Sequence, residues 1–399
     1  MQTLRISKRS LLKSIDIPAS KSYANRALIL CSILEDSPYI HELPDATDVS
    51  NLLECLKAIG LSFHHKEQQI KFFNSFPACE KNEEVALSVG EGGTTARFLS
   101  VMLLLGKQKY ILKLGKRLKD RPWGDFITTA RSLGAFAELK DDLLTIQGPV
   151  TFSSELYIDC SQTTQFASAF QLILHEEKTK VIPTNLSSSQ SYWEMTKEIQ
   201  RNIKGLLHYH IPRDWSSASY PMVFAALNQE IHFPGLHYDK FQADAKLFHL
   251  LKSFECLSET DSGIVVKPIK SEKEVHLDVS DCLDLVPALA FFLAHIEGVH
   301  SLKGVTNLVF KESNRLDEIM KLLKIFKRNS NTKEGVLYIH GSKEKISSSL
   351  DLVLPDDHRM VMTGTLFLLQ HFGGSVTPSE SVKKSYPGFF DIISSETSF

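Results

Sequence analysis

Six segments of the chain share one arrangement, in which small polar residues open a strongly apolar stretch of helical length. The openings lie at Lys21, Thr94, Gln165, Ser216, Asp284 and His358. Successive openings are 73, 71, 51, 68 and 74 residues apart. Over 399 residues this spacing predicts six copies of one unit, arranged as two domains of three units each. Ordinary alternation of strands and helices in an α/β protein would give a similar pattern, so that interpretation stays open here.

Short segments with the character of β-strands lie between these expected helices. They cover residues 110–114, 143–146, 156–158, 275–277 and 336–339. Amphipathic second helices are predicted over 51–59 and 316–326. The elements together predict a mixed α/β fold built from βαβ-type units. Residues 2–17 are predicted to form a strand that could pair with either half, and residues 227–235 are the predicted domain boundary.

Charge and cysteine usage narrow the classes of function. Lys plus Arg number 45 and Asp plus Glu number 47, which disfavours a basic nucleic-acid coat and requires any anion site to be a local cluster. The six cysteines form no CxxC pair and have no histidine at zinc spacing, which is typical of reduced thiols in a cytoplasmic protein. The N-terminus lacks the apolar core of a secretory signal. The apolar run 285–294 is too short for a membrane span of about 20 residues and predicts a buried helix.

The polar helix openings are candidate anion sites, because a helix N-terminus carries unpaired N–H groups and partial positive charge. Simple N-capping is the alternative for each of them. Two acids stand out against this background. Asp284 opens a strongly apolar helix, where it either caps the helix or takes part in chemistry. Glu312 lies between Lys311 and Arg315, two cations expected on one helix face, where it either forms a local ion pair or acts as an acid.

Ten segments then match one known family in its own order. They are PASKSYANRALIL, GGTTARFL, RLKDRPWGD, TTQFASA, SQSYWEMT, DWSSASY, DLVPALA, KESNRLDE, DDHRM and KSYPGFF. Through these segments the chain resembles the 5-enolpyruvylshikimate-3-phosphate synthase family over nearly its whole length. The resemblance implies two domains, each of three βαβαββ units, on either side of a cleft. It also implies that one domain holds residues 1–19 and 230–399 and that the other holds residues 20–229.

The resemblance further implies an activity. The family moves the carboxyvinyl group of phosphoenolpyruvate to the 5-hydroxyl of shikimate 3-phosphate and releases phosphate. It needs no metal ion and no organic cofactor. The expected partners are these two small molecules, with no nucleic acid and no membrane, and we expect a monomer.

Site residues follow by matching each family motif to this chain. Lys21, Asp284 and Glu312 match residues that take part in proton transfer. Contacts to shikimate 3-phosphate are implied for Lys21, Ser22, Arg26, Thr163, Thr164, Gln165, Ser189, Tyr192, Asp284, Asn307 and Lys311. Contacts to phosphoenolpyruvate are implied for Lys21, Gly93, Arg121, Gln165, Arg315, His358, Arg359 and Lys384.

One departure from the family pattern bears on function. Glu91 stands where the family usually has an asparagine beside phosphoenolpyruvate, so we expect its carboxylate to point away from that ligand or to pair with a cation. Two alternatives remain. One is a non-enzymatic anion-binding homologue, which Glu91 favours. The other is the related transferase that acts on a UDP-amino sugar, which the Lys21-Ser22 pair and the absence of a cysteine near Arg121 disfavour.

Overall fold

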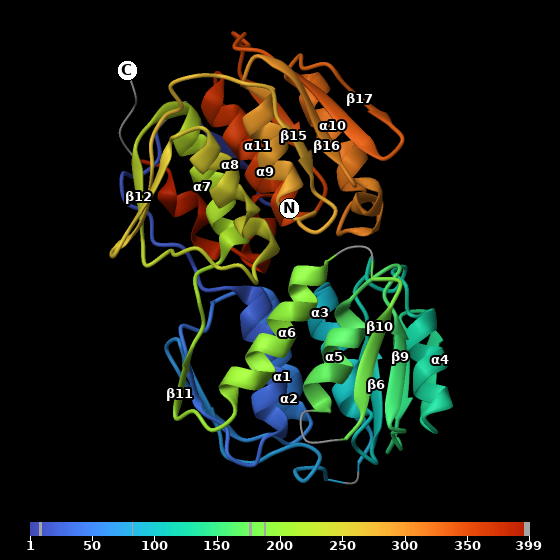
Figure 1. Ribbon diagram of the computed structural model, residues 1–399. Coiled ribbons are helices and arrows are strands. Elements are labelled where there is room, and N and C mark those ends of the chain that lie inside the picture. Colours follow the sequence, from blue (N-terminus) through green and yellow to red (C-terminus); the bar gives the residue numbers. More distant parts are fainter. Residues whose placement is uncertain (8–9, 82, 175–177, 187–188, 395–399) are drawn as a thin grey trace. The chain divides into compact units, whose positions relative to one another are not determined.

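The computed structural model describes residues 1–7, 10–81, 83–174, 178–186 and 189–394. The chain divides into two compact units (Figure 1). The N-terminal unit is residues 19–212, and the C-terminal unit combines residues 1–18 with residues 213–399. Each unit is described by itself below.

A bundle of helices forms the core of the N-terminal unit. Its members are α1 (Lys21–Ile33), α3 (Gly93–Leu103), α5 (Gln165–Ile173) and α6 (Gln190–Ile203), with α2 (Thr47–Ala58) packed against α1 and α3. In α1, every residue from Tyr23 to Ile33 is buried. A helix that is buried all round needs partners on every side, which explains why the apolar residues of this segment do not form a single stripe. Figure 1 shows these helices side by side.

Three sheets complete the N-terminal unit. Their strand orders are β11-β2-β4-β3, β5-β6-β8-β7 and β10-β9. The strands are β2 (Tyr39–His41), β3 (Phe63–Lys66), β4 (Gln69–Phe72), β5 (Val85–Ser88), β6 (Lys109–Lys113), β7 (Phe136–Lys140), β8 (Leu143–Gln147), β9 (Glu155–Asp159), β10 (Lys180–Thr184) and β11 (His208–His210), and the helix α4 (Gly124–Ser132) packs against β7. Leu144 and Ile146 of β8 are buried, whereas Leu143 and Gln147 are exposed. This period of two is the pattern of a sheet with one face on the core.

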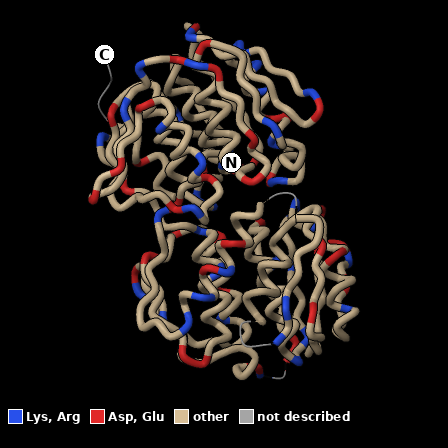
Figure 2. Tube along the Cα trace, viewed as in Figure 1, with Lys and Arg blue, Asp and Glu red and all other residues tan. Residues whose placement is uncertain are grey.

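The C-terminal unit has the same plan. The helices α7 (Trp215–Asn228), α9 (Val286–Ala294) and α11 (His358–Gln370) pack on one another. The unit also contains α8 (Lys246–Ser253), α10 (Arg315–Ile325) and the short 3-10 helices η1 (Ala243–Ala245), η2 (Thr306–Phe310), η3 (Ser379–Lys384) and η4 (Pro387–Ile392). Every residue of α9 is buried and none is charged, as its tan tube in Figure 2 shows. The predicted buried helix over 285–294 is therefore confirmed, beginning one residue later.

The sheets of the C-terminal unit have strand orders β1-β20-β19, β12-β14-β13 and β15-β16-β18-β17. The strands are β1 (Leu4–Ile6), β12 (Ile231–Pro234), β13 (Leu257–Thr260), β14 (Gly263–Val266), β15 (His276–Asp278), β16 (Gly298–Lys303), β17 (Ser330–Lys333), β18 (Val336–Gly341), β19 (Leu350–Val353) and β20 (Gly374–Thr377). The strand predicted over 2–17 is shorter than expected. Among the described residues of this segment, the strand covers Leu4–Ile6, and Leu11 and Ser14 form isolated bridges with Ile393 and His232.

The predicted repeat is visible in the topology. The order β5-α3-β6-α4-β7-β8 in one unit recurs as β15-α9-β16-α10-β17-β18 in the other. In both, the first two strands are parallel, and the second and third strands each pair antiparallel with the fourth. The helices expected at the six openings are all present, three in each unit, so the mixed α/β fold of two three-unit domains is confirmed.

Two of the repeat units contain a strand that comes from a distant part of the chain. β11 lies parallel to β2 and takes the place of a first strand for the unit that contains α1 and α2. β1 pairs antiparallel with β20, which fixes the N-terminus to the C-terminal unit. The residues alone left the partner of this strand open, whereas the resemblance assigned it to the C-terminal half, as the structure does.

The second domain boundary differs from the expected one. The structure divides the chain between Pro212 and Arg213, before α7, whereas the prediction placed the boundary between 229 and 230, after it. The physical reason is that α7 packs against α9 and α11 and has an almost wholly buried surface. The first boundary falls between Pro18 and Ala19, one residue before the predicted one.

Two further observations concern the whole chain. None of the helices among the residues that the structure describes is long and apolar enough to cross a membrane. All six cysteines are free thiols, and five of them are buried, as expected for reduced cysteines.

Candidate functional site

Asp284 lies just before α9 and is held by three cations. Arg315 Nη1 is 2.7 Å from Asp284 Oδ1, Lys311 Nζ is 3.4 Å from the same oxygen, and Arg359 Nη2 is 3.3 Å from Oδ2. Burial by itself raises the pKa of this carboxyl, but Arg359, Lys311 and Arg315 outweigh it and hold the pKa well below its ordinary range. Asp284 is therefore an ionised, charge-paired carboxylate, and not the helix cap that was the alternative.

Arg315 connects two buried carboxylates. Besides Asp284, it binds Asp357 through Nε (2.7 Å to Oδ2) and Nη2 (3.2 Å to Oδ1). The Arg315 side chain is 2% exposed and Asp357 is completely buried. Asp357 also accepts hydrogen bonds from Ser313 Oγ and from the backbone N–H of Arg359 at the start of α11. The beginnings of α9, α10 and α11 are thus joined through a single guanidinium.

The predicted placement of Lys311 and Arg315 on one helix face is wrong. Lys311 directly follows η2, and α10 begins only at Arg315, with Asn314 as its N-cap. The N-cap asparagine accepts a hydrogen bond from a backbone N–H of the first turn, which fixes the start of the helix. The two cations nevertheless converge, because the intervening loop directs both toward Asp284.

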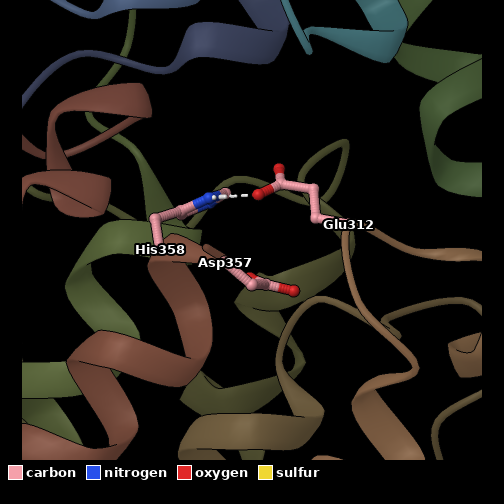
Figure 3. A group of neighbouring side chains, drawn as sticks. All are labelled: Glu312, Asp357 and His358. Atoms are coloured by element: carbon pink, nitrogen blue, oxygen red, sulfur yellow. Dashed lines mark hydrogen bonds and ion pairs between the residues drawn. The ribbon is translucent and has the colours of Figure 1, made fainter. Parts of the chain in front are cut away.

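Glu312 makes its contacts across the unit. Its Oε2 is 3.0 Å from His358 Nδ1 (Figure 3). The same oxygen is 3.9 Å from Lys384 Nζ. The alternative of an ion pair with Lys311 and Arg315 along one helix is therefore not what the structure shows. Lys384, at the end of η3, also lies 3.1 Å from Asp356. The glutamate thus has a histidine and a lysine next to it, which is a suitable environment for moving a proton.

Glu312, Asp357 and His358 together have the composition of a small metal shell, since one potential ligand atom of each lies within 4.8 Å of the others. Both oxygens of Asp357 already accept hydrogen bonds from Arg315, and Glu312 already pairs with His358. A metal ion would have to displace these bonds beside a buried guanidinium. The residues present fit an ion-pair network better than a metal centre.

Asp244 was missed by sequence reasoning. It lies on η1, is 2% exposed, and neither of its carboxyl oxygens has a hydrogen-bond partner among the described residues. Burial, followed by the charge of the nearby Asp284, raises the pKa of Asp244 to about 7, with Arg359 and Ser216 acting in the opposite direction. Ser216 lies beside it, and Ser216 Oγ accepts a hydrogen bond from Arg359. In the sequence QADAKLF nothing distinguishes this aspartate from a surface residue, so no local signal could have found it.

In the N-terminal unit, Lys21 begins α1 and pairs with Asp48 in the first turn of α2. Their Nζ and Oδ2 atoms are 2.7 Å apart. The backbone carbonyl of Asp48 in turn accepts a hydrogen bond from Thr95 Oγ1 in α3. Asp48 is a second residue that the sequence reasoning did not name. It holds the Lys21 ammonium at the beginning of the central helix.

Arg97 and Arg121 lie close to the start of α3, and neither has a carboxylate partner among the described residues. Arg97 is 5% exposed, lies over the rings of Trp123 and Phe166, and donates from Nη1 to Gln165 Oε1 at 2.6 Å. Burial, with the charge of Arg121 as a smaller cause, lowers the pKa of Arg97 to about 9. A buried guanidinium beside a half-buried one is an arrangement suited to binding an anion.

Gly93 makes the approach of Arg121 possible. A Cβ atom at position 93 would lie 2.6 Å from Arg121 Nη1 and 3.6 Å from Gln165 Oε1, closer than the first contact allows. Gln165 begins α5 and donates from Nε2 to Thr94 Oγ1 at 2.9 Å. Gly93, Arg121 and Gln165, which the resemblance grouped together, therefore lie together in the structure. Arg97 joins them and was not on the predicted list.

Arg26 makes several hydrogen bonds to other parts of the N-terminal unit. It donates from Nε to Thr196 Oγ1 (2.8 Å), from Nη1 to the carbonyl of Ser22 (3.0 Å) and from Nη2 to the carbonyl of Tyr192 (3.2 Å). Burial lowers its pKa to about 10. These contacts clamp α1 to α6 and bring Ser22 and Tyr192 to the same place.

The remaining predicted residues lie at or near helix beginnings. Thr163 Oγ1 accepts a hydrogen bond from the backbone N–H of Gln165, Thr164 is the N-cap of α5, and Ser189 is the N-cap of α6. Asn307 lies in η2. The N-terminal unit carries Lys21, Ser22, Arg26, Gly93, Arg121, Thr163, Thr164, Gln165, Ser189 and Tyr192, and the C-terminal unit carries Asp284, Asn307, Lys311, Glu312, Arg315, His358, Arg359 and Lys384.

Glu91 lies against the chain at residues 115–117. Its Oε2 accepts a hydrogen bond from the backbone N–H of Arg117 at 3.3 Å. A Cβ atom at position 115 would lie 2.4 Å from the carboxyl carbon, so the glycine there makes room for the carboxylate.

Comparisons with known proteins define the family. The family model "EPSP synthase (3-phosphoshikimate 1-carboxyvinyltransferase)" matches residues 7–393, so the chain belongs to this family. A 3-phosphoshikimate 1-carboxyvinyltransferase of Thermococcus kodakarensis is 28% identical over 395 residues, covering 94% of this chain and 95% of the relative. One of Aliivibrio fischeri is 25% identical over 406 residues with the same coverage.

Solved structures support the fold. An EPSP synthase from Acinetobacter baumannii matches with a TM-score of 0.77 at 20% identity, covering 98% of this chain and 97% of that one. The enolpyruvyl transferase NikO from Streptomyces tendae matches with a TM-score of 0.73 at 12% identity, covering 98% and 96%. The chain thus has the two-domain fold of enolpyruvyl transferases and is an enzyme of the EPSP synthase family.

Proposed function

We propose that this protein transfers the carboxyvinyl group of phosphoenolpyruvate to the 5-hydroxyl of shikimate 3-phosphate, with release of phosphate. The observation that carries the proposal is the contrast between the two acids. Asp284 is held ionised by three cations, whereas Glu312 contacts His358 and Lys384. A reaction that needs a base at one atom and an acid at another requires two carboxyl groups in different environments.

The chemistry follows from these two environments. Glu312 donates a proton to the methylene carbon of phosphoenolpyruvate, and the positive character that develops at the neighbouring carbon is attacked by the hydroxyl oxygen. Asp284 accepts the hydroxyl proton, which gives a tetrahedral ketal. Loss of a proton from the new methyl group and departure of phosphate then restore the vinyl group. Positioned acid and base groups contribute roughly 10²–10⁴ in rate.

Cations hold the anionic substrates against their mutual repulsion. We assign Lys21, Arg97 and Arg121 of the N-terminal unit to this role, together with Arg359 and Lys384 of the C-terminal unit. Arg315 has a different role in this proposal. Its Nε, Nη1 and Nη2 atoms are all bonded to Asp284 or Asp357, so it positions the base and does not clamp the substrate. Anions bound by preorganised, desolvated cations are stabilised without the cost of rearranging solvent.

The test is turnover, with matched variants. Purified protein is mixed with both substrates, and phosphate release and product mass are followed. Glu312→Gln and Asp284→Asn should each lower kcat by about 10² or more with little change in KM. The control is Glu318→Gln, which removes a carboxylate paired only with Lys321 on α10 and should leave kcat unchanged. Near-normal turnover in a folded Glu312→Gln protein would contradict the assignment of the acid.

A different enolpyruvyl acceptor is the second candidate, because the chain is nearly as similar in fold to NikO as to the EPSP synthases. The same assay with UDP-amino sugars in place of shikimate 3-phosphate separates the two. Phosphate release with an amino sugar alone would favour this candidate. Absence of turnover with every acceptor, combined with binding of phosphoenolpyruvate, would favour a non-enzymatic anion-binding homologue.

A further inference from the structure

Three histidines, none of them a residue of the candidate site, lie on one face of the sheet β11-β2-β4-β3. His208 and His210 lie two residues apart on β11, the edge strand, and therefore point to the same face. His41 lies on the adjacent strand β2, directly opposite His210 in a parallel pair. His208 and His210 are exposed, and His41 is half-buried. The strand β11 is labelled in Figure 1.

His41 contacts both of the other imidazoles. His41 Nε2 is 2.9 Å from His208 Nδ1, and the rings of His41 and His210 are stacked with centroids 4.5 Å apart. Glu42 accepts from the third ring, since its Oε2 is 3.0 Å from His210 Nδ1. Gln69 of β4 approaches His41 Nδ1 at 3.2 Å. In metal sites, a carboxylate commonly accepts a hydrogen bond from one ring nitrogen of a histidine, which fixes the tautomer and leaves the other nitrogen free to bind the metal ion.

We propose that His41, His208 and His210 form a surface binding site for a divalent transition-metal ion of the zinc and copper class. Two of the ring nitrogens are already nearly as far apart as two nitrogens that bind the same metal ion. Zinc–nitrogen bonds of about 2.0–2.1 Å in a tetrahedral shell place neighbouring ligand nitrogens about 3.3 Å apart, and His41 Nε2 and His208 Nδ1 are 2.9 Å apart. The metal takes the place of the proton that the two rings share.

His210 supplies the third ligand through Nε2, while Glu42 holds its Nδ1–H. In the structure His210 is stacked on His41, so its exposed ring has to turn out of the stack to reach the ion. Rotamer changes of exposed side chains occur within nanoseconds and present no barrier. Imidazole is the ligand type that zinc and copper share, and the remaining coordination positions would be taken by water.

The charge around the cluster favours a cation. Glu42 adds a negative charge. Lys71 of β4 is the opposing charge on this face. It lies over the ring of Tyr39 and pairs with Asp36, which offsets part of its effect.

The experiment is a zinc titration of the full-length protein, pretreated with a chelator and then freed of it, at pH 7.5 in a non-coordinating buffer. Isothermal titration calorimetry should show one saturable site. His208→Ala and His41→Gln should each weaken zinc binding at least tenfold. His237→Ala, which removes an exposed histidine of the C-terminal unit, is the matched control and should bind zinc as the wild type does.

Two further measurements locate the ion. Lowering the pH to 5.5 should weaken binding at least tenfold, because protons compete for the imidazole nitrogens. Glu312→Gln should leave the zinc affinity unchanged, which separates this cluster from the group formed by Glu312, Asp357 and His358. With Cu²⁺ as probe, electron paramagnetic resonance should show nitrogen coordination that is reduced in His208→Ala.

The proposal is overturned if no saturable site appears, or if His208→Ala and His237→Ala bind zinc equally well. Loss of zinc binding in Glu312→Gln alone would also overturn it, because the ion would then lie in the other unit. Circular dichroism melts of each variant show whether the fold is kept. The outcome is independent of the proposed enzyme activity, since no residue of the cluster takes part in it.

Discussion

Two buried arginines, one in each unit, have opposite charge environments. In the C-terminal unit, Arg315 is enclosed by two carboxylates that compensate its charge. In the N-terminal unit, Arg97 is about as deeply buried, but its contacts are aromatic rings, an amide oxygen and a carbonyl. The difference indicates that Arg315, whose charge is compensated, serves the architecture, whereas Arg97, which lies beside Arg121 with no carboxylate partner among the described residues, is prepared for an incoming anion. Figure 2 shows that acidic and basic residues are interspersed over both units, so the contrast is local to the sites.

The largest expected effect comes from removing each arginine in turn. Arg315→Met should lower the free energy of unfolding by about 3–5 kcal/mol, because it leaves the buried Asp357 without its charge partner. Arg97→Met should change it by no more than about 1 kcal/mol in anion-free buffer, since no buried charge loses its partner. Urea unfolding followed by circular dichroism measures both values. Equal losses in the two variants would remove the distinction between the units.

Asp244 sharpens the comparison because it is a buried acid that forms no ion pair among the described residues. Its folded pKa of about 7 lies above the ordinary value of 3.8, so the folded state holds its proton more tightly and stability falls as pH rises from about 4 to about 7. Asp244→Asn should remove this loss, with a gain of up to about 4 kcal/mol at pH 8 and almost none at pH 4. Melting temperatures across this pH range are the measurement, and a gain that is the same at both ends would show that the carboxyl does not titrate as described.

The histidines provide a third comparison between the units. His295 and His371 are a buried pair in the C-terminal unit, with Nε2 atoms 3.0 Å apart, Nδ1 of His371 accepting from the N–H of Ile346, and Nδ1 of His295 bonded to the carbonyl of Phe291. Burial, with the charges of Arg328 and Lys345 as smaller causes, lowers the pKa of His371 to about 4.

The free energy of unfolding should therefore depend on the protonation of this histidine pair at acid pH. Between about pH 6.5 and pH 4 the unfolded chain binds a proton that folded His371 does not, so stability falls as pH falls, by about 1.4 kcal/mol per pH unit. His371→Gln should flatten this slope in equilibrium unfolding, whereas His208→Gln in the exposed cluster of the N-terminal unit should leave it nearly unchanged. An unaltered slope in His371→Gln would assign the acid sensitivity to other groups.

The smallest effect is expected at Glu91. Its carboxylate accepts one long hydrogen bond from a backbone N–H, so Glu91→Asn should change the free energy of unfolding by only a few tenths of a kcal/mol. Under the proposed function, the KM for phosphoenolpyruvate should stay similar or fall, because a negative charge near an anion site is removed. Steady-state kinetics provide the measurement, and a large rise in KM would mean that the glutamate contributes to binding.

Much of the secondary structure could be predicted from the sequence. The six apolar stretches with polar openings are all helices, and segments such as 143–146 and 336–339 are strands of the expected character. Local periodicity suffices for such elements, because a helix or a half-buried strand repeats its contacts every few residues. The polar openings also indicated where anions could bind, since the beginnings of helices carry unpaired N–H groups wherever the helix lies in the fold, whereas the individual site residues followed from the resemblance.

The partners of these elements were decided only by the tertiary structure. The pairing of β11 with β2, and of β1 with β20, joins segments more than 160 residues apart, and the strands themselves are only three or four residues long. Nothing in three residues specifies so distant a partner. The position of α7 in the C-terminal unit has the same origin, because its packing against α9 and α11 is a long-range choice.

The sequence by itself determined that Asp284 and His358 stand at the openings of apolar helices. The tertiary structure decided which charge meets which: Glu312 reaches His358 on another element of the unit, and Lys311 reaches Asp284 from a loop and not from a helix. It alone made Asp244 a buried acid and left Arg97 without a carboxylate. Propensities act between residues a few positions apart, whereas burial and charge pairing depend on atoms that come together only when the whole chain has folded.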